Sequence, residues 1–193
     1  MRKESGFSLL ELLSVVTIVG ALSAASIPRI ITAVQSYRLN AGAQQVVEAL
    51  QAAKFAAIQA NASRMAYFNT STNATSVGTS TAAAAIPLPS GVTFTTITGT
   101  APSIVSTAAT NAATIGGQQS NNALAAVSFP VASGSFYQAT FSSRGLTGGS
   151  NLNPGTVHWV YLKNTNNELM AVTLTSAGSI QTWRWSGSAW STQ

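Results

Sequence analysis

The chain has 193 residues with nine Lys and Arg, four acidic residues, one His and no Cys. The absence of cysteine excludes a disulfide framework and a cysteine-ligated metal site. The few acids and the single histidine leave little for a catalytic centre, so no enzymatic activity and no cofactor are predicted.

The first apolar segment has an unusual charge pattern. Arg2 and Lys3 precede Gly6, and the stretch from Phe7 to Ile27 carries one charge, the carboxylate of Glu11. An α-helix of this length crosses a ~30 Å hydrocarbon core. Because a carboxylate in a membrane helix costs roughly 2.5 to 3.5 kcal/mol, such groups are usually paired and functional.

A secretory signal peptide or a plain membrane anchor also begins with basic residues and an apolar run. A conventional signal peptide, however, has its cleavage site after the apolar run. Here the charged leader ends at Gly6, before that run. The pattern therefore predicts cleavage ahead of the helix, with the helix kept in the mature protein.

The segment Gly6-Phe7-Ser8-Leu9-Leu10-Glu11-Leu12 resembles the processing site of type IV prepilins and type II secretion pseudopilins. The resemblance implies that prepilin peptidase cleaves after Gly6 and methylates the new amino terminus at Phe7. It also implies assembly with other pilin or pseudopilin subunits at an inner-membrane platform. A free amine in a bilayer needs a counter-charge, and Glu11 of a neighbouring subunit would supply it and set the stagger.

The membrane topology follows from the basic leader. By the positive-inside rule Arg2 and Lys3 stay cytoplasmic, so the chain beyond Pro28 faces the periplasm or the cell exterior. Pro28 lies about one membrane thickness from Phe7. A proline there either permits a helix kink or ends the membrane helix.

An Ala- and Gln-rich segment, residues 29–61, follows the membrane segment. Its apolar residues recur at helical spacing, which predicts one helix from Phe7 almost to Asn61, about 80 Å long. The predicted stripe consists of Ala43, Val46, Val47, Leu50, Ala53 and Ala57. We therefore divide the chain into a leader (1–6), a membrane and filament-core segment (7–28), an amphipathic half-helix (29–61) and a β-rich domain (62–193).

The remainder favours strands and loops, and the fold class is α+β, with a long amino-terminal helix packed on an antiparallel sheet domain. The polar stretches 69–85 and 101–126 are expected to be loops or edge strands. The predicted strands are Met65 to Asn69, Val92 to Ile97, Leu124 to Phe129, Phe136 to Phe141, Val157 to Leu162, Met170 to Leu174 and Ile180 to Trp185.

Parts of the chain also resemble minor pilins and pseudopilins of the GspH/FimT type. They are the helix from Tyr37 to Asn61 and two closing segments, Phe141–Leu146 and Ala177–Ile180. The chain departs from that pattern at Lys54, where arginine is more usual. The resemblance implies a type IV pilin-like fold with an inner-membrane anchor and a periplasmic domain.

Two alternative functions stay open at this stage. One is an ordinary membrane-anchored periplasmic protein. The other is a DNA-binding minor pilin for DNA uptake, with phosphate contacts from Arg144, Lys163 and Arg184 and base stacking on neighbouring tryptophans. Seven basic residues spread over the mature chain do not by themselves predict a nucleic-acid patch.

Overall fold

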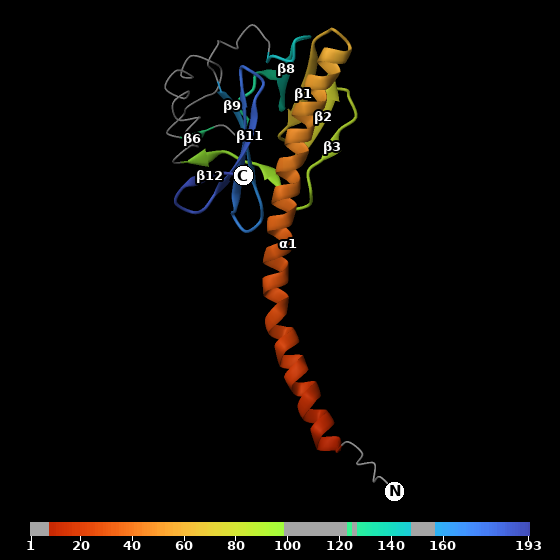
Figure 1. The fold of residues 1–193 in the computed structure, drawn as a ribbon, viewed down its shortest axis with the longest axis vertical. Helices are drawn as coiled ribbons and strands as arrows, with labels where there is room; N and C mark the ends of the chain where they lie inside the picture. Colours follow the sequence, from red (N-terminus) through yellow and green to blue (C-terminus); the bar gives the residue numbers. More distant parts are fainter. Residues whose placement is uncertain (1–7, 99–122, 125–126, 148–156) are drawn as a thin grey trace.

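Helix α1 (Leu9–Gln59) forms the long axis of the molecule, and the β-rich domain packs against its second half (Figure 1). This computed structural model describes residues 8–98, 123–124, 127–147 and 157–193. The helix has 51 residues and is about 75 Å long at 1.5 Å per residue. It ends just before Asn61, whose φ of 45° is incompatible with a continuing helix.

Pro28 lies inside α1, and the helix continues through it. The helix itself therefore does not end at Pro28, and the end of its membrane-embedded part at this residue stays a prediction. A proline has no backbone N–H and leaves one helical hydrogen bond unmade. One turn later, Thr32 Oγ1 donates to the Arg29 carbonyl at 2.9 Å. A kink at Pro28 during extraction from the membrane stays a prediction.

The strands form two five-stranded antiparallel sheets and one two-stranded sheet. Sheet A has the order β3-β2-β1-β8-β7, sheet B has the order β12-β11-β10-β9-β4, and β5 pairs with β6. The predicted α+β arrangement, a long apolar amino-terminal helix with antiparallel sheets in the carboxy-terminal domain, is confirmed. The strands are β1 (Arg64–Asn69), β2 (Ala74–Gly78), β3 (Ile86–Pro87), β4 (Thr93–Phe94), β5 (Ile97–Thr98), β6 (Ala123–Leu124), β7 (Val131–Ser133), β8 (Phe136–Phe141), β9 (Val157–Lys163), β10 (Leu169–Thr175), β11 (Ile180–Trp185) and β12 (Trp190–Thr192).

Two strand predictions are wrong in part. The segment Val92 to Ile97 is not one strand, because the chain changes partner within it: β4 pairs with β9, whereas β5 pairs with β6. In the segment Leu124 to Phe129, residue Val127 forms only an isolated bridge with Val160. Residues 125–126 lie outside the described residues.

Strand β2 lies in a polar stretch that was expected to form a loop or edge strand, and it is an interior strand of sheet A. It pairs with β1 on one side and β3 on the other. Thr75 is 1 % exposed, and its hydroxyl accepts a hydrogen bond from Gln45 Nε2 of α1 at 3.0 Å. A hydroxyl that is paired in this way can be buried against a helix without a large cost. Small polar residues therefore fill an interior position here.

The predicted apolar stripe of α1 is confirmed as a core face, in which Val47 is only partly buried. Ala43, Val46, Leu50, Ala53 and Ala57 are all fully buried. They form one core with inward residues of both large sheets. The helix thereby joins sheet A to sheet B.

Both faces of β9 are buried, which explains why its sequence shows no polar and apolar alternation. Val160 and Leu162 belong to the core around α1. Trp159 and Tyr161 point to the other face and form a second cluster with Trp183. A strand buried on both sides has no polar face to display.

His158 is part of an aromatic stack in the interior. Its ring lies 5.1 Å from Phe129, which in turn lies 5.4 Å from Phe68. Nδ1 is 3.2 Å from the carbonyl oxygen of Ser128, so the neutral ring donates there. Burial lowers the pKa of His158 below its ordinary value of 6.5, because desolvation disfavours the charged ring.

We expect His158 to make the stability of the domain depend on pH. The unfolded chain takes up the proton near the ordinary pKa, whereas the folded chain does so only at lower pH. The contribution is therefore complete above pH ~6.5 and is lost as pH falls from there through the folded pKa. Urea unfolding of the chain in detergent at mildly basic and mildly acidic pH measures this loss.

The matched control is His158→Phe, which keeps an aromatic ring in the stack and removes the titrating group. The pH dependence of its free energy of unfolding should be weaker than that of the wild type over the same range. An unchanged pH dependence in this variant would assign the effect to other groups.

Candidate functional site

The first half of α1 exposes its apolar side chains in every direction. It contains a window of 18 residues with a mean hydropathy of 2.0, none of which is buried, and its length and composition are sufficient to cross a membrane. Successive helical positions are ~100° apart, so a run of exposed apolar residues covers the whole circumference. The exposed residues include Leu9, Leu10, Leu12, Leu13, Val15, Val16, Ile18, Val19, Leu22, Ile27, Ile30 and Ile31.

Glu11 lies in the first turn of this exposed helix. Its backbone groups contact Ser8 and Ser14, but no side chain among the described residues pairs with its carboxylate. The next charged residue along the helix, Arg29, is 18 positions away, or about 27 Å. The position favours an anion, since the helix dipole is positive at this end. Gly6 and Phe7 lie outside the described residues.

A comparison with known families bears directly on this segment. Residues 1–27 match the prokaryotic N-terminal methylation motif. This match supports the prepilin superfamily. No curated protein and no solved structure matches the chain. The motif and the exposed helix together support a membrane-anchored, type IV pilin-like or pseudopilin subunit that prepilin peptidase processes and that assembles with other such subunits.

The three cations considered for DNA contact do not lie together. Arg144 precedes Gly145, which packs against Ile58 near the end of α1. Arg184 lies near the carboxy-terminal end of β11, and its Nη2 is 3.4 Å from Glu168 Oε1. Lys163 lies at that same end, at the close of β9. The structure therefore brings Lys163 and Arg184 to one end of the domain and Arg144 to the other.

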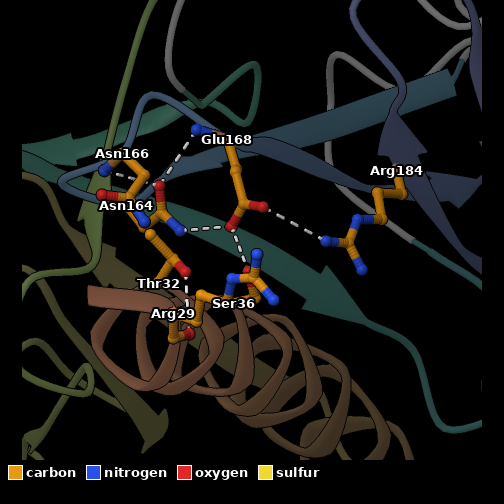
Figure 2. A network of polar contacts seen from close by, with 7 residues as sticks. All are labelled: Arg29, Thr32, Ser36, Asn164, Asn166, Glu168 and Arg184. Carbon is orange, nitrogen blue, oxygen red and sulfur yellow. Dashed lines mark hydrogen bonds and ion pairs between the residues drawn. The ribbon is translucent and has the colours of Figure 1, made fainter. Parts of the chain in front are cut away.

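Sequence reasoning missed the polar network around Glu168, which Figure 2 shows beside α1. Glu168 Oε2 accepts hydrogen bonds from Ser36 Oγ and Asn164 Nδ2, each at 2.6 Å. Its Oε1 faces Arg184, and the side-chain oxygen of Asn164 accepts from the backbone N–H of Asn166 at 3.0 Å. The network fixes the β9–β10 turn to the helix. The signal available in the sequence was one acid next to an Asn-rich turn.

The two closing segments meet at Lys54. Lys54 Nζ donates to the carbonyl of Gly178 at 3.1 Å. A Cβ on Gly178 would lie 2.7 Å from the carbonyl oxygen of Gly145. Both glycines have positive φ, 71° at Gly145 and 78° at Gly178. The contact attaches the carboxy-terminal half of α1 to both segments, at the end opposite Glu168.

Among the described residues, no group of three or more His, Asp or Glu side chains could hold a metal ion. The candidate site is the exposed apolar half of α1, in which Glu11 is the only carboxylate among the described residues.

Proposed function

We propose that this chain is a minor pilin or pseudopilin of the GspH/FimT type, a structural subunit of a type IV pilus or a type II secretion pseudopilus. The observation that carries the proposal is the carboxylate of Glu11 in the first half of α1, whose apolar surface is uncovered. Such a subunit functions by assembling into a filament. The cleaved chain is expected to wait in the inner membrane and then enter a filament.

The same apolar surface serves both states. In the bilayer, lipid covers the residues from Leu9 to Ile31; in the filament, helices of neighbouring subunits cover them. The methylated amine of Phe7 pairs with Glu11 of a neighbour, because each charge is costly without the other in an apolar environment. Because the helix is unbroken from Leu9 to Gln59, the position of the amino terminus in the filament also fixes the position of the domain.

The meeting of the two closing segments at Lys54 supports the GspH/FimT assignment. The sequence resemblance linked these segments to one domain type. Their contact with the helix gives a physical reason for their joint occurrence, since each supplies a glycine at a close approach to the other or to α1.

Isolation of filaments tests the proposal. The chain should be present in sheared surface filaments, or in periplasmic pseudopili, at an amount below that of the major subunit. An ordinary anchored periplasmic protein would stay wholly in the membrane fraction, and that result would contradict the proposal.

A bulky residue at Gly6 should block processing. Gly6→Val places a branched side chain next to the bond that the peptidase must cleave. Nearly all of the protein should therefore remain unprocessed. Co-expression with prepilin peptidase and measurement of the intact mass decides this. Ser5→Ala is the matched control, and it should be cleaved like the wild type.

A further inference from the structure

One end of the β-rich domain faces the membrane that holds α1. When the apolar stretch from Leu9 spans a ~30 Å hydrocarbon core, Arg29 lies at its far boundary, 20 residues or about 30 Å along the helix. Ser36, which binds Glu168 of the β9–β10 turn, is about 10 Å further. A headgroup layer is ~5 to 7 Å thick on each side. The β9–β10 turn is thus held beside the headgroups.

The turn between β11 and β12 lies at the same end. Strand β11 starts near Gly178, which contacts Lys54, and ends beyond Arg184, which contacts Glu168. It therefore runs toward the membrane along α1, as Figure 1 shows. Trp185 and Trp190 flank the turn, both partly buried, with ring centroids 5.4 Å apart, and Trp190 also packs against the cluster of Trp159, Tyr161 and Trp183.

Several cations lie at this end of the molecule, on α1, β9 and β11. Arg29 lies on the same face of α1 as Ser36, two turns earlier, and Figure 2 shows it below Glu168 and Arg184. Glu168 is the one acid at this end among the described residues. We call the group the membrane-side patch: Arg29, Tyr37, Arg38, Lys163, Arg184, Trp185 and Trp190.

We propose that the membrane-side patch binds the anionic phospholipid headgroups of the bilayer that holds α1. Tyr and Trp side chains prefer the membrane interface, where the ring is apolar and its edge is hydrated. Lys and Arg side chains attract anionic lipid within a Debye length. Tyr37 is 75 % exposed on the helix just above the membrane segment, as expected for such a contact.

Lipid binding here would hold the domain in a fixed orientation on the membrane before assembly. The Ser36–Glu168–Arg184 contacts join α1, the β9–β10 turn and β11 at this end, so the side chains that these elements carry there face the same membrane. The inference rests on membrane insertion of α1, but it does not depend on polymerisation.

The test uses the full chain, because it has no cysteine and accepts a single label. A polarity-sensitive fluorophore is placed on Ser188→Cys, in the β11–β12 turn, or on Ser63→Cys, at the opposite end of the domain. Both positions are exposed. Each protein is reconstituted in phosphatidylcholine vesicles with or without phosphatidylglycerol. Flotation of the vesicles after an alkaline wash establishes insertion separately.

We expect the label at 188 to become about twofold brighter and blue-shifted when phosphatidylglycerol is present, and to lose this response at high salt. The label at 63 should not respond. Lys163→Gln should weaken the response, whereas Arg64→Gln, the same charge change at the far end, should leave it intact. Arg184→Gln is avoided as the sole test because it also disturbs Glu168.

Equal emission at 188 in both lipids, or an equal response at 63, would overturn the inference. A response of label 188 to duplex DNA and not to anionic lipid would assign the patch to nucleic acid instead. Chain that fails to float would overturn membrane anchorage itself, and this outcome is distinct from the loss of lipid docking by an inserted chain.

Discussion

Glu11→Ala is expected to leave cleavage intact and to reduce incorporation into filaments by about tenfold or more. The peptidase acts at Gly6, five residues earlier, so processing does not need this carboxylate. Assembly does, because the amine of Phe7 would enter an apolar filament core without a counter-charge. A lost contribution of about 1.4 kcal/mol per subunit already corresponds to a tenfold change. The ratio of filament-bound to membrane-bound chain measures the effect.

Two further variants separate charge from packing. Glu11→Gln keeps the size of the side chain and removes its charge, so it should fail as Glu11→Ala does. Thr17→Ala changes an exposed polar residue of the same helix whose hydroxyl bonds only to the Ser14 carbonyl, and it should assemble normally. Normal assembly of both Glu11 variants would make the pairing mechanism wrong.

Gly178→Ala should destabilise the domain by about 2 to 4 kcal/mol. The residue has φ of 78°, a region where a non-glycine residue costs about 1 to 3 kcal/mol. The new Cβ would also lie 2.7 Å from the Gly145 carbonyl oxygen, so the two closing segments must separate. The shift would strain the Lys54 hydrogen bond to the Gly178 carbonyl. Urea unfolding of the chain in detergent measures the loss.

Gly187→Ala is the matched control. Gly187 also has a positive φ, 98°, but nothing lies within 4 Å of an added Cβ there. The variant therefore has the backbone strain but no steric clash, and it should be destabilised less than Gly178→Ala. Equal losses in the two variants would show that contact between the closing segments contributes nothing.

The helical half of the molecule could be predicted from the sequence because its signals are local. Glu11 stands alone in an apolar run, and the buried residues from Ala43 to Ala57 repeat at helical spacing. The end of α1 at Gln59 agrees with the prediction of a helix almost to Asn61, and the predicted start at Phe7 lies outside the described residues. These features depend on neighbours within a few turns, so one chain is enough to detect them.

The sheet domain was harder to predict because its determinants are distant in sequence. Ser36 and Glu168 are 132 positions apart, and neither stands out by residue type alone. Strand β2 consists mainly of small and hydroxyl residues, which become strand residues only through pairing and contact with α1. Strand β9 lacks alternation because it is buried on both faces. Tertiary context decides each of these cases.

The arrangement of the membrane-side end of the domain follows only from the sequence and the structure together. The sequence places Trp183, Arg184 and Trp185 in a row, which also suits nucleic-acid binding. The structure separates them: Trp183 is buried, Arg184 faces Glu168, and Trp185 contacts Trp190. Their position beside the membrane segment follows only from the length of α1 and its contact at Ser36.

The most direct test of the central claim is intact-mass and amino-terminal analysis of the protein recovered from its native membranes. Processing as proposed predicts a chain that begins at Phe7 and carries an N-methyl group. An unprocessed start, or cleavage beyond Ala25, would contradict the prepilin assignment and return the protein to the anchored or secreted class.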